Sequence, residues 1–320
     1  MTGRRHAGWL MASFTDDDDH RDGNEQVRFA VAIGDEPTHW HPLAGWRPIL
    51  ASTVGEHGAR DPFLVRDGAR FVLIATDLRT TDAADWDRAV RHGSTGVLVW
   101  ESVDLVDWTG PDLVPIAVPG AGNAWAPKAY PLPDGSWQVY FASSLHPAGS
   151  DRTTATHQRM FVARTRDFRS FEPAEVYLDP GHDVIDVAFL QLGGSVQRFA
   201  ADARTDDPAR AVQFVRQESG SVRDDPCFTD VVDRIGAGVL RRGEGPAVFA
   251  DPVGDGAWLF IDEFTFRGYQ LFRSHDPARG RWEHVPGTVL PPGVKHGSVL
   301  SIDQHELDRL VDAFGIAAAG

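Results

Sequence analysis

Cysteine is almost absent from this sequence, which excludes several classes of protein at the outset. The 320 residues contain a single cysteine, Cys227, so no disulfide can form within the chain. Long apolar runs are also missing, and none approaches the roughly 18 residues that a helix needs to cross a bilayer. The N-terminal segment has basic residues but lacks the apolar core of a signal peptide, so we expect a cytoplasmic protein.

Positively charged residues are also fewer than negatively charged ones. The chain has 31 lysine and arginine residues against 46 aspartate and glutamate residues, which gives a formal net charge of −15. No basic cluster is long enough to follow a phosphate backbone, so neither nucleic acid nor an anionic membrane is expected as a partner. Apolar residues make up 42% of the chain, which is ample for the core of a soluble protein.

Helical periodicity is scarce, and short apolar or alternating runs take its place. Typical runs are RFVLIAT, GVLVWES, SWQVYFAS and AWLFIDEF, bounded by turns such as Asp67-Gly68 and Asp134-Gly135. Such runs are typical of β-strands joined by tight turns. The late segment DQHELDRLVDAF differs, because Asp303 and Glu306 have the spacing of a capping box ahead of a helical apolar pattern. We therefore predict an all-β fold with one short C-terminal helix.

Five short motifs recur along the chain at similar intervals. They are RDPF at Asp61, WAPK at Trp125, IDVAF at Asp186, EGPAVF at Glu244 and HGSVL at His296. Their spacing of about 50 to 65 residues is long enough for one four-stranded propeller blade with its loops. We predict a five-bladed β-propeller that forms a single domain over residues 1–320, with N-terminal strands around residues 9–14 and 26–33 closing the ring. A β-sandwich is the second candidate.

A propeller would bring the five motifs together, because the inner strand of every blade lines the central axis. Three of the motif residues are carboxylates: Asp61, Asp186 and Glu244. Clustered carboxylates raise one another's pKa, so one can stay protonated as a general acid while another remains an ionised base. Cleavage of a glycosidic bond requires such a pair.

Each motif residue also has a purely structural interpretation. Asp61 before a proline is typical of a turn, and Glu244 between two glycines could mark a loop. Trp125 and His296 belong to residue types that often fill a core. Asp186 is harder to explain in this way, because a carboxylate within an apolar strand must be paired or protonated. The common spacing favours a joint functional interpretation, in which Pro62 restricts the backbone of Asp61 and so helps to position it.

These segments resemble glycoside hydrolase family 43, whose members are five-bladed propellers that act mostly on arabinose- and xylose-containing glycans. The resemblance extends over nearly the whole chain. The matching segments, in blade order, are GARDPFLVRDGARFVLIATDL, AWAPKAYPLPDGSWQVYFAS, DVIDVAFLQLGG, GEGPAVF and KHGSVLSI.

The resemblance implies a role for each motif residue. Asp61 would be the general base that activates water, Glu244 the general acid, and Asp186 the residue that tunes and orients the acid. His296 matches a histidine that, in several members, faces a hydrated calcium ion in the axial channel. No cofactor would be required, and this calcium ion is the one expected metal. We further assign substrate contacts to Trp125, Phe63, Asp77 and His296.

Two departures from the family pattern concern the sugar site. Lys128 follows WAP where this branch usually has an acidic residue, and Ala200 and Ala201 stand where it often has an aromatic residue and a lysine. Neither departure changes the three carboxylates.

The leading hypothesis for function is an inverting, exo-acting α-L-arabinofuranosidase that acts on small oligosaccharides, with a β-xylosidase as the nearest alternative. A retaining fructosidase is disfavoured, because the chain has no Asn-Asp-Pro motif and no Glu-Cys motif. A non-catalytic carbohydrate-binding propeller is the remaining alternative. The sugar, its linkage and the oligomeric state stay open at this point.

Overall fold

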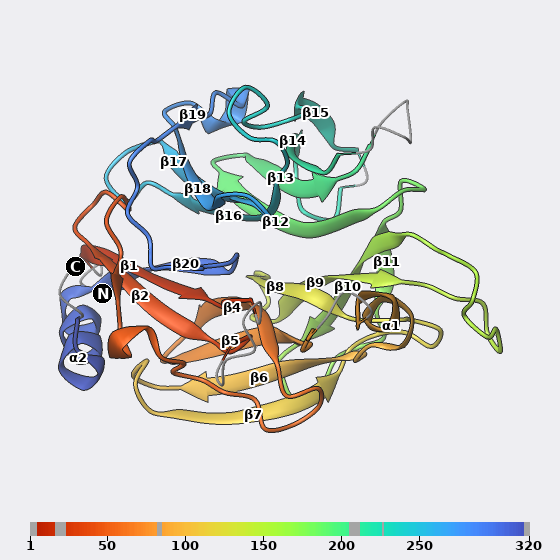
Figure 1. Ribbon diagram of the computed structural model, residues 1–320. Coiled ribbons are helices and arrows are strands. Elements are labelled where there is room, and N and C mark those ends of the chain that lie inside the picture. Colours follow the sequence, from red (N-terminus) through yellow and green to blue (C-terminus); the bar gives the residue numbers. More distant parts are fainter. Residues whose placement is uncertain (1–4, 17–23, 82–84, 205–211, 226, 317–320) are drawn as a thin grey trace.

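The structure confirms the predicted five-bladed β-propeller (Figure 1). It is a computed structural model that describes residues 5–16, 24–81, 85–204, 212–225 and 227–316. Each blade is an antiparallel sheet of four strands, and the five sheets surround a central axis. Among the described residues, no helix has the length and apolar character needed to span a bilayer.

The first three blades follow one another along the chain, each starting with its inner strand. Blade 1 comprises β4 (Ala59–Asp67), β5 (Arg70–Asp77), β6 (Gly96–Ser102) and β7 (Trp108–Pro115). Blade 2 comprises β8 (Trp125–Pro131), β9 (Trp137–Ser144), β10 (Gln158–Thr165) and β11 (Glu175–Leu178). Blade 3 comprises β12 (Val184–Leu192), β13 (Ser195–Asp202), β14 (Phe214–Gly220) and β15 (Thr229–Val232).

The last blade combines the two ends of the chain, as predicted. Blade 4 comprises β16 (Glu244–Ala250), β17 (Ala257–Glu263), β18 (Gly268–Ser274) and β19 (Glu283–His284). Blade 5 comprises β20 (Ser298–Asp303), β1 (His6–Ser13), β2 (Arg28–Ile33) and β3 (His41–Pro42). In Figure 1, β20 lies beside β1 although the two strands come from opposite ends of the sequence. This pairing within blade 5 joins the two ends of the chain and so closes the ring.

The inner strands β4, β8, β12, β16 and β20 form a continuous ring, in which each strand contacts the next and β20 contacts β4. A side chain strengthens the closure. The hydroxyl of Ser298 donates to the carbonyl oxygen of Pro62 at 3.0 Å and accepts from the amide of Leu64 at 2.9 Å. The starts of all five inner strands therefore converge on one mouth of the axial channel.

Five apolar cores hold the ring together, one between each pair of adjacent blades. Successive side chains of a strand point to opposite faces of its sheet. In β5, Leu73 therefore packs toward blade 5 while Ile74 packs toward blade 2. Both faces of a blade are buried in this way, which explains why its strands read as nearly continuous apolar runs rather than as alternating ones.

In the part of the chain that the structure describes, two α-helices lie outside the sheets. The predicted C-terminal helix is confirmed as α2 (Gln304–Phe314), and its capping box is formed by Asp303 and Glu306. The second helix, α1 (Asp85–His92), was not predicted. It has only one buried residue, Ala89, and therefore lacks the apolar pattern that signals a helix. Acidic residues in its first turn and basic residues in its last turn stabilise it instead.

Candidate active site

Four inner strands share the same backbone irregularity near their first residues. Pairing with the second strand of the blade skips two residues, between Arg60 and Phe63, Trp125 and Lys128, Ile185 and Ala188, and Glu244 and Ala247. The first skipped residue has a positive φ each time: 51° at Asp61, 48° at Ala126, 61° at Asp186 and 56° at Gly245. A bulge of this kind redirects the neighbouring side chains, and such bulges are common next to active sites.

The bulges show that the motif residues do not all occupy the same position in their strands. Asp61 and Asp186 occupy the positive-φ position, whereas Glu244 precedes it by one residue and corresponds to Arg60 in blade 1. A residue before a proline normally adopts an extended conformation. Asp61 precedes Pro62 and yet lies in the left-handed region, where a residue other than glycine costs about 1–3 kcal/mol. Its conformation is thus imposed by the bulge rather than by the proline.

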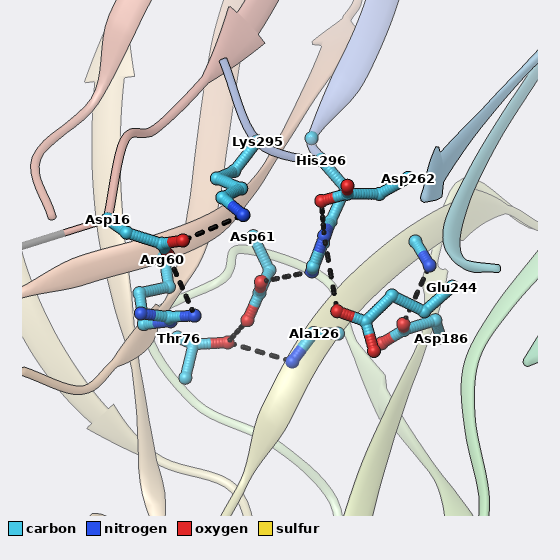
Figure 2. A network of polar contacts seen from close by, with 12 residues as sticks. Asp16, Arg60, Asp61, Thr76, Ala126, Asp186, Glu244, Asp262, Lys295 and His296 are labelled. Carbon is cyan, nitrogen blue, oxygen red and sulfur yellow. Dashed lines mark hydrogen bonds and ion pairs between the residues drawn. The ribbon is translucent and has the colours of Figure 1, made fainter. Parts of the chain in front are cut away.

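His296 lies between two of the carboxylates (Figure 2). Its Nε2 atom is 2.8 Å from Oδ1 of Asp61, and its Nδ1 atom is 3.9 Å from Oε1 of Glu244. The same Nδ1 atom is 3.1 Å from Oδ2 of Asp262. Burial alone would lower the pKa of His296, but the hydrogen bonds to Asp262 and Asp61 raise it well above its usual range. The ring is therefore a buried imidazolium.

Asp61 is held in its ionised form. Burial acts to raise its pKa, but the hydrogen bond and charge of His296, the charge of Arg60 and a hydrogen bond from Thr76 outweigh burial and lower the pKa. The Thr76 hydroxyl donates to Oδ2 of Asp61 at 2.6 Å and accepts from the amide of Ala126 at 2.8 Å. This chain of contacts ties the carboxylate to the start of blade 2 (Figure 2).

Glu244 is held in the opposite state. Burial is the largest cause that raises its pKa, and the negative charges of Asp186, Asp262 and Asp61 raise it further, to about 8. The charge of His296 opposes this shift only in part. Glu244 therefore carries a proton at neutral pH, close to an aspartate that does not.

Asp186 links its own strand, β12, to the inner strand β16 that carries Glu244. Its Oδ2 atom accepts from the amide of Gly245 at 2.9 Å, next to Glu244. Burial raises the pKa of Asp186 above its usual value, and the charges of His296 and Lys128 oppose this shift only in part. Asp186 thus orients the backbone beside Glu244 and adds negative charge to its surroundings.

Two residues that sequence reasoning missed complete the cluster. Asp262 on β17 is fully buried and contacts His296. Tyr269 on β18 accepts from the amide of Gly297 at 2.8 Å and donates to the carbonyl oxygen of Gly245 at 3.2 Å. Tyr269 therefore holds the segment around His296 against the segment around Glu244. Asp262 could have been found, because it lies within the apolar run AWLFIDEF and so resembles Asp186 in VIDVAFL.

The structure brings Asp61, Asp186, Glu244 and His296 together but places the other predicted residues around them. Trp125 lies at the mouth, with its ring 6.0 Å from that of Trp86 on α1 in an edge-to-face arrangement. Phe63 lies further along β4, where its ring is 5.6 Å from that of Tyr130. The carboxylate of Asp77 is buried beneath a loop and accepts from the amide of Glu56 at 2.7 Å. Substrate contact by these three residues stays a prediction.

The two departures from the family pattern have different surroundings. Ala200 lies in the core between blades 2 and 3, and Ala201 is fully buried beside it in β13. The ammonium of Lys128, by contrast, reaches across the axial channel to blades 3 and 4, where it donates to the carbonyl oxygens of Asp186 and Pro246.

A network of charges surrounds the mouth next to Asp61. Arg60 forms an ion pair with the buried Glu25, and its guanidinium also lies 3.5 Å from Oδ1 of Asp16. Lys295 reaches the same aspartate, with its Nζ atom 2.7 Å from Oδ2 (Figure 2). Arg60 stacks over the ring of Phe14 with 4.5 Å between guanidinium carbon and ring centroid. These contacts fix the strand that carries the proposed base.

The same cluster contains three side chains that could bind a metal ion. Glu244, Asp262 and His296 each place one possible ligand atom within 4.8 Å of the others. A metal needs an unprotonated imidazole nitrogen, however, and both nitrogens of His296 lie at hydrogen-bond distance from carboxylate oxygens. The residues therefore do not fit a metal ion bound directly by His296. A calcium ion held through water in the channel stays a prediction.

Comparison with known proteins places this geometry in context. Among curated proteins, an α-L-arabinofuranosidase from Bifidobacterium longum subsp. longum is 32% identical over 167 residues, which cover 47% of this chain and 16% of the relative. The chain thus spans only a small part of the length of that protein.

Solved structures share the fold at low sequence identity. An α-L-arabinanase from Penicillium chrysogenum, solved with arabinobiose, has a TM-score of 0.55 at 16% identity, over 93% of this chain and 85% of the other. A variant α-L-arabinanase from Cellvibrio cellulosa has a TM-score of 0.59 at 11% identity, over 92% of this chain and 96% of the other. At these identities the likeness concerns the fold alone.

Family membership rests on a match over most of the chain. The family described as "Probable glycosyl hydrolase domain", which is related to glycoside hydrolase family 43, matches residues 5–308. The chain therefore belongs to this family of glycoside hydrolases.

Proposed function

We propose that this chain hydrolyses terminal α-L-arabinofuranosidic bonds in small arabinose-containing oligosaccharides, with inversion at the anomeric carbon. One observation carries the proposal: Asp61 and Glu244 face opposite nitrogens of the same imidazolium and have opposite charge states at neutral pH. An ionised carboxylate and a protonated one are the base and the acid that glycoside hydrolysis needs.

The reaction follows from these two states. Asp61 takes a proton from water, and the water oxygen forms a bond to the anomeric carbon. The bond from that carbon to the leaving oxygen breaks, and Glu244 donates its proton to this oxygen. The products are the free sugar and the shortened oligosaccharide. Because water attacks the face opposite the leaving group, the configuration inverts.

Asp186 and His296 support both roles. The charge of Asp186 helps to keep Glu244 protonated, and the charge of His296 helps to keep Asp61 ionised. The paired rings of Trp125 and Trp86 at the mouth provide an apolar surface against which a sugar ring can lie. The preference for arabinose rests on the Bifidobacterium relative, which is named as an α-L-arabinofuranosidase.

The proposal can be tested with a panel of 4-nitrophenyl pentosides and hexosides. The α-L-arabinofuranoside should be cleaved fastest, and proton NMR of the first product should show the inverted anomer. Asp61→Asn should lower kcat by at least about 100-fold on the best nitrophenyl substrate, and Glu244→Gln should do so on an unactivated arabino-oligosaccharide. Asp107→Asn serves as the matched control, since Asp107 is an exposed carboxylate between β6 and β7, and it should keep the wild-type rate.

Several outcomes would contradict the proposal in distinct ways. Preferred cleavage of a β-xyloside would show that the substrate is a xyloside and not an arabinofuranoside. A product with retained configuration would exclude the inverting mechanism. Binding of arabino-oligosaccharides by calorimetry, without turnover of any glycoside, would favour a carbohydrate-binding propeller. Near wild-type rates in either carboxylate variant would refute the assigned roles.

A further inference from the structure

Lysine is rare in this chain, and one of its two lysines occupies the axial channel. The sequence contains only Lys128 and Lys295, and arginine supplies every other permanent cation. Lys128 lies on β8 and is buried. Its Nζ atom donates to the carbonyl oxygen of Asp186 at 3.1 Å and to that of Pro246 at 2.7 Å. One ammonium thus joins the inner strands of blades 2, 3 and 4.

Both acceptors lie in the bulges that carry the acidic groups. Asp186 and Pro246 are among the residues skipped by the strand pairing in β12 and β16. A bulge interrupts the ladder of backbone hydrogen bonds, and a buried carbonyl there needs another donor. Lys128 supplies this donor to both strands. The positions equivalent to Lys128 on these two strands are Ala188 and Ala247, whose side chains carry no donor.

A compact ammonium suits this place better than the guanidinium used elsewhere in the chain. It can point donors at two carbonyl oxygens from a single nitrogen atom, whereas a guanidinium is a wide planar fork. Its position also balances charge. The groups that face Lys128 are Asp186 on β12 and Asp61 on β4, and Glu244 begins the adjacent β16. Burial lowers the pKa of Lys128 to about 8, while Asp186 and Asp61 oppose that shift, so the ammonium is charged at neutral pH.

We infer that Lys128 is a positioning residue of this site, and the inference rests on the proposed hydrolase function. Its ammonium fixes the bulges of β12 and β16, so that Asp186 and Glu244 face the axis. Its charge favours the ionised forms of Asp61 and Asp186, which are otherwise supported by His296 and, for Asp61, by Arg60. Lys128 touches neither the proposed base nor the carboxyl group of the proposed acid in this arrangement, and acts through the strands that carry them.

Three substitutions separate the hydrogen bonds from the charge. Lys128→Met removes both, Lys128→Gln keeps a donor without the charge, and Lys128→Arg keeps the charge. We expect kcat/KM to fall about 10- to 100-fold in the Met variant and by less in the Gln variant, which keeps a donor. In both, the acidic limb of the pH profile should move to higher pH, because Asp61 loses a nearby positive charge. The Arg variant should keep the wild-type acidic limb whatever its rate.

A second measurement works in the native protein and needs no turnover. Protein labelled with ¹³C-lysine has two side-chain Cε signals, and Lys295→Arg assigns them. The Lys128 signal should titrate near pH 8. In Asp186→Asn its midpoint should fall by roughly half a unit or more, since a negative charge that favours the ammonium is lost.

The outcomes decide the inference independently of the hydrolase proposal. A wild-type rate and acidic limb in Lys128→Met or Lys128→Gln would overturn the positioning role. So would an unchanged Lys128 midpoint in Asp186→Asn, even if no glycoside is cleaved or the Met variant fails to fold. Conversely, absence of glycosidase activity combined with the expected NMR shift would refute the proposed function while leaving the Lys128–Asp186 linkage intact.

Discussion

Asp61 and His296 form the contact on which the chemistry of this site depends, with 2.8 Å between Oδ1 and Nε2. Asp61 comes from blade 1, whereas His296 precedes the inner strand of blade 5, so the contact exists only when the ring is closed. It keeps Asp61 ionised in a buried place and directs the other side of the imidazolium toward Glu244 and Asp262. Ring closure and the charge states of the acid and base are therefore linked.

The first prediction concerns the pH dependence of the wild-type protein. Glu244 must be protonated to act as the acid, and its pKa is raised to about 8, so kcat/KM should fall as the pH rises through about 8. Asp61 must be ionised, and its pKa lies below the usual value of 3.8, so activity should persist to about pH 4. A pH profile measured on the best nitrophenyl substrate checks both limbs. An alkaline limb near pH 5 would contradict the assignment of Glu244.

Replacing His296 should shift the acidic and the alkaline limb of the pH profile in the same direction. The charge of His296 lowers the pKa of Asp61 and also that of Glu244. In His296→Asn both pKa values should rise, so the acidic and the alkaline limbs should both shift to higher pH while the rate falls. If both limbs stay in place, the imidazolium does not set the charge states of its neighbours.

Gly245 offers a test of how closely the site is packed. A Cβ atom at Gly245 would lie 2.2 Å from Cγ of His296, and the residue has φ of 56°. Gly245→Ala should therefore displace His296, lower kcat at least tenfold and destabilise the fold by about 1–3 kcal/mol. The matched control is Gly135→Ala in a turn of blade 2. There φ is 80°, and the added Cβ would meet no atom within 4 Å. The control should lose about 1 kcal/mol of stability, from backbone strain alone, and keep full activity. Equal activity of Gly245→Ala and Gly135→Ala would contradict the close approach of residue 245 to His296.

How much of this site could be predicted from the sequence depends on the kind of residue. Asp61, Asp186, Glu244 and His296 were found because polar residues at strand starts recur with the period of a blade. The one-residue offset of Glu244 was missed, although it can be read from the prolines, since Glu244 stands two residues before Pro246 and Asp61 one before Pro62. The bulges themselves arise from strand pairing across each blade, which local sequence does not specify.

Other residues of the site are harder to identify from the sequence. Thr76 and Tyr269 are ordinary strand residues in the sequence, and only the closed ring shows that they bridge neighbouring blades. Lys128 was noticed as a departure from a family pattern, but its two acceptors lie 58 and 118 residues further along the chain. Contacts at such separations follow from the propeller topology and not from local propensity. The sequence therefore predicts the fold and the carboxylates better than the residues that position them.

Chelation should leave the chemistry of the proposed acid and base unchanged. His296 and Arg60 favour the ionised form of Asp61, His296 and Lys128 favour that of Asp186, and the nitrogens of His296 are engaged by carboxylates. We expect an excess of EDTA to leave kcat/KM unchanged, because the proposed acid and base work without a metal ion. A fall in Tm or activity that added Ca²⁺ reverses would show instead that an ion in the channel supports the site.

The most direct test of the central claim compares leaving groups in Glu244→Gln. If Glu244 protonates the leaving oxygen, its loss should matter most for substrates whose leaving group needs a proton. We predict that kcat falls by at least about 100-fold for an unactivated arabino-oligosaccharide but by less than about tenfold for the 2,4-dinitrophenyl arabinoside. An equal loss on both substrates, or no loss on either, would contradict the assignment of Glu244 as the general acid.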